Sequence, residues 1–67
     1  MQAQEMIRAW VRENGIKFSW IAAQVTVRPI AMSRWMNGHQ IPDEFHRGRL
    51  SKVIGIDVTD RNMWLKS

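Results

Sequence analysis

The stretch that decides the fold is Gly15–Pro42, GIKFSWIAAQVTVRPIAMSRWMNGHQIP. Apolar residues in its first half recur at the spacing of one buried helix face: Phe18, Ile21, Ala22 and Val25. A second series begins at Pro29, which suits the first turn of a helix, and ends at the stop signal Asn37-Gly38. Its apolar members are Met32, Trp35 and Met36. Only about three residues, 26–28, separate the two series, so the stretch predicts two short helices joined by a tight turn.

The flanking sequence predicts one helix before this stretch and one after it. Residues 3–14 end at Asn14-Gly15, where glycine takes a left-handed conformation at little cost. Their expected buried face consists of Ala3, Ile7, Trp10 and Val11. Residues 43–54 can begin at an Asp43 cap and end at Gly55. Their expected core face consists of Phe45, Leu50, Val53 and Ile54.

Two further expectations complete the all-α prediction. Gly48 costs about 1 kcal/mol relative to alanine inside a helix, so it is expected to mark a close contact between helices. A fifth short helix is predicted over about residues 58–66, because Asp57 and Asp60 favour a helix start. The chain is therefore expected to form one domain, residues 1–67, as a compact bundle of about five short helices. A domain this small buries only about 60% of its unfolded surface, so a partner subunit is expected to stabilise it.

Charged side chains are distributed unevenly along the chain. The chain has ten Lys and Arg residues and six Asp and Glu residues, which gives a net charge of +4. No acidic residue lies between Glu13 and Asp43, whereas Lys17, Arg28 and Arg34 lie inside that span. A folded segment without carboxylates suits a polyanion such as nucleic acid. The alternative is a chance distribution in a short chain.

Other classes of protein find little support in the residues. The absence of cysteine excludes disulfides and thiolate metal sites, and two histidines with Asp43 make a thin metal-ligand set. Ser19 and Ser51 lack an evident base, and no glycine-rich phosphate loop is present. We therefore expect no enzyme activity, cofactor, metal or small-molecule ligand. Residues 1–10 lack the apolar run of a signal peptide, and nothing approaches the ~18 to 20 apolar residues of a membrane span, which predicts a cytoplasmic protein.

The same stretch resembles the Cro/C1-type helix-turn-helix repressors of bacteria and their phages. The most specific part is Ser33-Arg34-Trp35-Met36-Asn37-Gly38, followed after a short loop by Ile41-Pro42. Further matching positions are Gly15-Ile16, Ile21-Ala22, Val25 and Val27, and a weaker likeness runs on through Val53–Asp57. The resemblance implies a lambda-repressor-like fold with its motif over about residues 18–37. It also implies a sequence-specific DNA-binding regulator of transcription.

Three positions depart from the family pattern. Thr26 stands where the family usually has glycine in the turn, and a β-branched residue is unfavourable at positive φ. Phe18 replaces a frequent glutamine, which leaves only a backbone N–H to reach a phosphate. Arg28 replaces the usual serine or threonine before the recognition helix, so it is a poor cap but a long basic arm.

The resemblance also assigns roles to individual side chains. A recognition helix lies in the major groove with its N-terminal residues on base edges, which gives the base contacts to Arg28, Pro29, Ile30, Ser33 and Arg34. Arg34 suits guanine and Ile30 suits a thymine methyl. The alternatives are a phosphate contact for Arg34 and, as an equal choice, for Arg28. For Ile30 the alternative is an apolar residue that is stranded at the surface or covered by a neighbour. Phosphate contacts are expected from Lys17, Phe18, Asn37, His39 and Gln40, with pure capping as the alternative for Asn37.

A homodimer on a two-fold operator is the expected assembly, with two recognition helices about 34 Å apart. The candidate dimer residues are Ile56, Val58, Met63, Trp64 and Leu65. Trp20 is expected on the outer side of its helix, where it and Trp64 are candidates for a dimer interface, because tryptophan is enriched at interfaces. The alternative is that the fold covers them. Two other functions use the same fold: a protein-binding adaptor and an antitoxin-type regulator. We expect the protein to repress transcription, and activation of transcription is the alternative.

Overall fold

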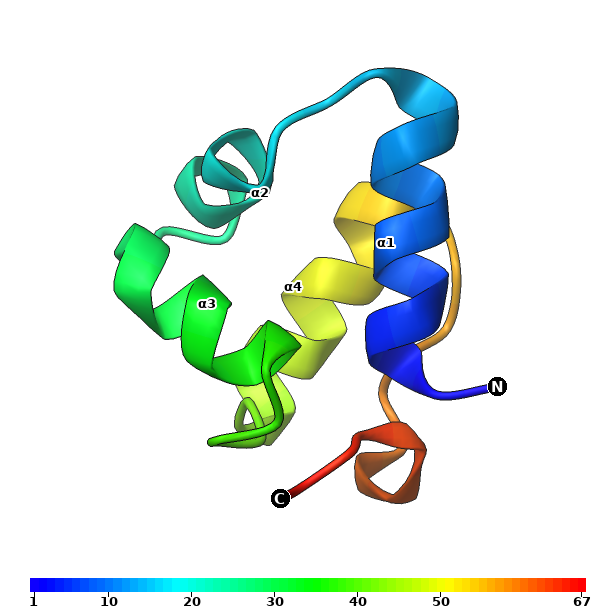
Figure 1. Cartoon of the computed structure of the whole chain (residues 1–67), viewed down its shortest axis with the longest axis vertical. Coiled ribbons are helices and arrows are strands. Elements are labelled where there is room, and N and C mark those ends of the chain that lie inside the picture. Colours follow the sequence, from blue (N-terminus) through cyan, green and yellow to red (C-terminus); the bar gives the residue numbers. More distant parts are fainter.

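Four α-helices and one 3-10 helix, without any strand, make up the computed structural model, which describes residues 1–67 (Figure 1). The elements are α1 (Ala3–Asn14), α2 (Phe18–Gln24), α3 (Pro29–Met36), α4 (Glu44–Ile54) and the 3-10 helix η1 (Arg61–Met63). The prediction of an all-α fold is confirmed. The first four helices begin and end within one residue of the positions that the sequence predicted.

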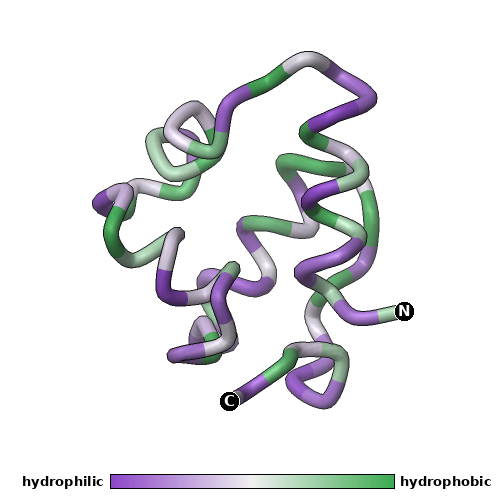
Figure 2. Tube along the Cα trace, viewed as in Figure 1, coloured by the Kyte–Doolittle hydropathy of each residue, from purple (hydrophilic) through white to green (hydrophobic).

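α4 lies between α1 on one side and the α2–α3 pair on the other (Figure 1). Hydrophilic and hydrophobic residues are mixed along all four helices, so each helix supplies one apolar face to a shared core (Figure 2). That core consists of Ala3, Ile7, Ile21, Ala22, Val25, Met32, Trp35, Met36, Leu50, Ile54, Val58 and Trp64. None of the helices has both the length and the apolar character that a bilayer crossing requires.

The prediction of a fifth helix over residues 58–66 is wrong. Only Arg61–Met63 form a helical turn, and it is of the 3-10 type. The side chain of Asp57 accepts hydrogen bonds from the backbone N–H and the hydroxyl of Thr59, at 2.9 and 2.6 Å. Asp60 accepts one from the N–H of Asn62 at 2.9 Å. The bonds between Asp57 and Thr59 offer the backbone an alternative to a helix, whereas the Asp60 bond caps the start of η1.

Two expectations for α4 are also corrected. Phe45 was expected in the core but is 65% exposed. It lies nine residues before Ile54, about two and a half helical turns, so the two side chains point to opposite sides of α4. Gly48 was expected to mark a close helix contact, but a Cβ atom added there would meet nothing within 4 Å.

Gln4 ties three distant parts of the chain together. Its side chain is 1% exposed, and its Nε2 donates to the carbonyls of Trp35 and Leu65, both at 3.0 Å. Its Oε1 accepts the N–H of Leu65, also at 3.0 Å. A buried amide is tolerated only when its polar atoms are paired, and both polar atoms of the Gln4 amide have hydrogen-bond partners. Gln4 therefore fastens the C-terminal residues and the end of α3 to α1.

Candidate functional site

The connection between α2 and α3 runs through Val25–Arg28. The N–H of Val27 donates to the carbonyl of Ala22 at 2.9 Å, and the N–H of Thr26 donates to that of Ala23 at 3.2 Å. This pair of bonds is the Schellman ending of a helix, which needs a left-handed residue at the position of Thr26. Thr26 has a φ of 61°. The glycine expected by the family pattern is missing, but the turn that glycine would serve is kept.

α3 is divided into a buried face and an exposed face. Met32, Trp35 and Met36 are buried in the core, as the sequence predicted. The opposite face follows the spacing i, i+3, i+4, i+7 and consists of Ile30, Ser33, Arg34 and Asn37, all exposed. We call these four residues the α3 outer face. The remaining two residues predicted to contact bases, Arg28 and Pro29, are also exposed and stand at the start of the helix.

The five residues predicted to contact phosphates do not share one environment. Lys17 is exposed and precedes α2, and His39 and Gln40 are exposed in the loop after α3. Phe18 is partly buried and its ring packs against the core, so only its backbone is available. Asn37 donates through Nδ2 to the Ser33 hydroxyl at 3.2 Å, a side-chain bond and not a cap on a backbone carbonyl.

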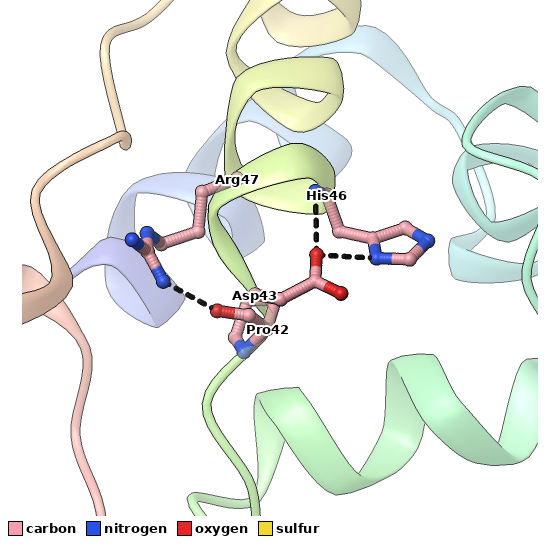
Figure 3. Close-up of polar contacts among 4 residues, drawn as sticks. All are labelled: Pro42, Asp43, His46 and Arg47. Carbon is pink, nitrogen blue, oxygen red and sulfur yellow. Dashed lines mark hydrogen bonds and ion pairs between the residues drawn. The ribbon is translucent and has the colours of Figure 1, made fainter.

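The charge around the α3 outer face is positive or neutral. Arg28 and Arg34 are exposed, and neither α2 nor α3 carries a carboxylate. Acidic side chains begin again at Asp43, whose Oδ1 caps α4 by accepting the N–H of His46 at 2.9 Å and lies 2.7 Å from the His46 ring (Figure 3). The backbone hydrogen bond from His46 lowers the pKa of Asp43, with further lowering from the His46 ring. This acid is therefore engaged at the start of α4.

A cleft of about 250 Å³ opens where α1, α2 and α3 meet. Its polar lining residues are Arg8, Ser19, Ser33 and Asn37, and its apolar lining residues are Phe18, Pro29, Met32 and Met36. Ser33 and Asn37 belong to the α3 outer face, so the cleft adjoins the surface predicted to contact DNA.

Arg8 is the residue of this site that sequence reasoning missed. It is exposed on α1, and its Nη2 donates to the carbonyl of Met36 at 2.7 Å. Nothing in the local sequence of α1 signals this contact, because the two residues are 28 positions apart. Only the packing of α1 against the end of α3 brings Arg8 to the cleft.

The predicted dimer residues are split between the core and the surface. Val58 is fully buried and Trp64 is 5% exposed, with its indole N–H donating to the Val58 carbonyl at 3.0 Å. These two residues pack within their own chain, so the covering that was the alternative for Trp64 is what the structure shows. Leu65 is exposed, and Ile56 and Met63 are partly buried.

Trp20 lies on the outer side of α2, as the sequence predicted. It is 45% exposed and stacks on Trp10 of α1 with ring centroids 6.4 Å apart. Trp10 was expected in the core and is partly buried against it. Trp20 therefore remains exposed despite this stack.

Comparisons of the chain with models of protein families, with curated proteins and with solved structures found no match.

Proposed function

We propose that the protein is a sequence-specific DNA-binding regulator of transcription in which α2 and α3 form a helix-turn-helix of the lambda-repressor-like type. The observation that carries the proposal is the α3 outer face. It is exposed and free of carboxylates, the exposed Arg28 stands at the start of the same helix, and the exposed Lys17 precedes α2. Such a face suits the major groove, where side chains must reach base edges between two rows of phosphates.

Each residue of the face has a physical role in this proposal. Arg34 donates two hydrogen bonds to the O6 and N7 atoms of a guanine. Ile30, which is 59% exposed, packs on a thymine methyl and gains the burial that it lacks in the free protein. Ser33 offers a short hydroxyl, and Arg28 extends from the start of α3 to a base edge or a phosphate. Lys17, His39 and Gln40 contact the backbone and fix the register of the protein on the duplex.

The proposed assembly is a homodimer on a two-fold operator, acting as a repressor of the Cro type that blocks transcription by occupying its site. Two copies of α3 would enter successive major grooves about 34 Å apart. Since Val58 and Trp64 are buried within one chain, a dimer contact would use other residues, of which Leu65 is an exposed candidate from the predicted set.

Binding to mixed-sequence duplex DNA across a series of salt concentrations tests the proposal. Each phosphate that the protein neutralises releases counterions, so the logarithm of the affinity should fall linearly with the logarithm of the salt concentration. With several basic contacts, we expect the affinity to fall by orders of magnitude between 50 and 200 mM salt, as is typical of proteins with many phosphate contacts. Absence of binding, or binding that ignores salt, would overturn the proposal.

The exposed Trp20 favours a second candidate function, a protein-binding module. Tryptophan is enriched at protein interfaces and among the residues that dominate their affinity. Here Trp20 is 45% exposed and stacks on Trp10, and neither residue belongs to the α3 outer face. Binding through this surface would depend weakly on salt and would be lost in Trp20→Ala, whereas DNA binding through α3 would survive that substitution.

A further inference from the structure

We infer that the cleft between α1, α2 and α3 seats a phosphodiester group of the bound nucleic acid, and that Arg8 is the residue that holds it. This inference rests on the proposed function and adds to it a contact from α1, a helix outside the proposed motif. It names a binding site at the edge of the α3 outer face and the chemical class of its ligand.

The position of the cleft places it beside the proposed DNA surface. Ser33 and Asn37 line the cleft and belong to the α3 outer face. A helix that lies in the major groove has the sugar-phosphate backbone along both of its sides. A cleft that opens beside α3 therefore meets the backbone when α3 meets the bases.

The hydrogen-bonding groups of the cleft suit an anion. The Arg8 guanidinium donates one N–H to the Met36 carbonyl at 2.7 Å, which leaves others of its five N–H donors free. Since the Ser33 hydroxyl oxygen accepts from Asn37 at 3.2 Å, its own proton remains free to donate. Ser19 adds an exposed hydroxyl from α2. These side chains offer donors from three helices, and no carboxylate lines the cleft.

The hydrogen bond to Met36 also restricts the Arg8 side chain before a phosphate binds. An arginine side chain loses rotamer freedom when it is fixed, and this cost weakens contacts made by mobile side chains. Arg8 is already held at the C-terminal end of α3, where a positive charge is favoured by the exposed carbonyls. The guanidinium therefore meets a phosphate with part of its ordering already complete.

The apolar lining distinguishes a backbone phosphate from a free anion. Phe18, Pro29, Met32 and Met36 line the same cleft of about 250 Å³. A free phosphate ion has no apolar surface to place against them, whereas a phosphodiester carries a sugar on either side. The cleft thus suits a phosphate within a nucleic-acid strand.

Replacement of Arg8 by glutamine tests this assignment through the salt dependence of DNA binding. One lost phosphate contact should reduce the slope of log affinity against log salt by about 0.9 and weaken binding to all sequences alike, by about tenfold at low salt. Arg8→Lys keeps the charge and should keep the slope. The matched control is Arg61→Gln, which removes the same charge from η1, outside the cleft, and should change the slope less. Thermal unfolding of each variant establishes that binding is measured on folded protein.

A duplex with a neutral methylphosphonate at one position, moved along the strand, locates the contact. At one position per bound subunit, the neutral methylphosphonate should lower the affinity of the wild-type protein. At that same position it should leave the affinity of Arg8→Gln unchanged. If wild type binds DNA but both proteins respond alike at every position, the Arg8 assignment is overturned and the proposed function stands. If wild type binds no DNA, both are overturned. Strong competition by inorganic phosphate at millimolar concentration would instead assign the cleft to a free anion.

Discussion

Thr26 holds a backbone conformation that L-residues with branched side chains rarely adopt. Its φ is 61°, and it is the one residue other than glycine with a positive φ. The same Schellman ending closes α1 at Gly15 and α3 at Gly38, and both of those positions have glycine. The left-handed conformation costs a residue with a Cβ roughly 1–2 kcal/mol, so α2 ends at a strained residue.

We expect Thr26→Gly to stabilise the protein. Relief of the strain outweighs the larger conformational freedom that glycine has in the unfolded chain, and the net gain should be about 1 kcal/mol. For a domain of this size, that raises Tm by roughly 4–8 °C. Thermal unfolding followed by circular dichroism measures it, with Thr26→Ala as a control that should gain much less. An unchanged or lower Tm in Thr26→Gly would show that the threonine is not strained.

Two glycines of neighbouring elements should respond in opposite ways to the same substitution. Gly48 lies inside α4 with open space around it, so Gly48→Ala should stabilise the helix by about 1 kcal/mol through helix propensity alone. Gly38 follows α3 with a φ of 76°, and a Cβ there would lie 3.4 Å from Leu65. Gly38→Ala should therefore destabilise the protein by at least about 1 kcal/mol. Chemical denaturation of both variants checks the pair, and destabilisation by Gly48→Ala would contradict the open surroundings of that position.

Acid should weaken the start of α4 and the segment that follows the helix. The backbone hydrogen bond from His46 lowers the pKa of Asp43, and the Thr59 hydroxyl does the same for Asp57, each from an ordinary value of 3.8. A carboxyl with a lowered pKa in the folded state stabilises that state above its unfolded pKa. The contribution is lost as the pH falls through the lower, folded value.

We therefore expect Tm to fall as the pH drops below about 4. The double variant Asp43→Asn with Asp57→Asn should lose less Tm over that interval than wild type, since neither amide titrates and asparagine still caps a helix. Thermal unfolding at a series of pH values measures the difference. Parallel curves for the two proteins would contradict the contribution of these carboxylates.

The helices themselves were largely predictable from local sequence, because apolar spacing and end signals act over a few residues. The pattern of residues 29–36 predicted both the buried and the exposed side of α3. The same local signals were only partly right at the C-terminus, where Asp60 caps the short helix η1 but Asp57 bonds to Thr59 instead of starting a longer helix. Phe45 lies on the side of α4 opposite Ile54, so its apolar character alone does not place it in the core.

Across the whole molecule, the contacts that sequence reasoning missed are those between distant residues. Gln4 bonds to Leu65, 61 positions away, and Arg8 bonds to Met36, 28 positions away. Neither contact has a periodic or motif signal, since each depends on how α1 packs against the end of α3. For the same reason, the α3 outer face could be predicted from its own sequence, but the cleft beside it could not.

The central claim is that the α3 outer face selects DNA sequence, and selection from a random duplex pool tests it most directly. Wild-type protein and Arg34→Ala would each be used to enrich bound DNA, which is then sequenced. We predict that wild type enriches a site with two-fold symmetry, and that Arg34→Ala loses the preference at one base pair in each half-site, worth about 1–3 kcal/mol of discrimination. Failure of wild type to enrich any sequence, or an identical enriched site for both proteins, would contradict the claim.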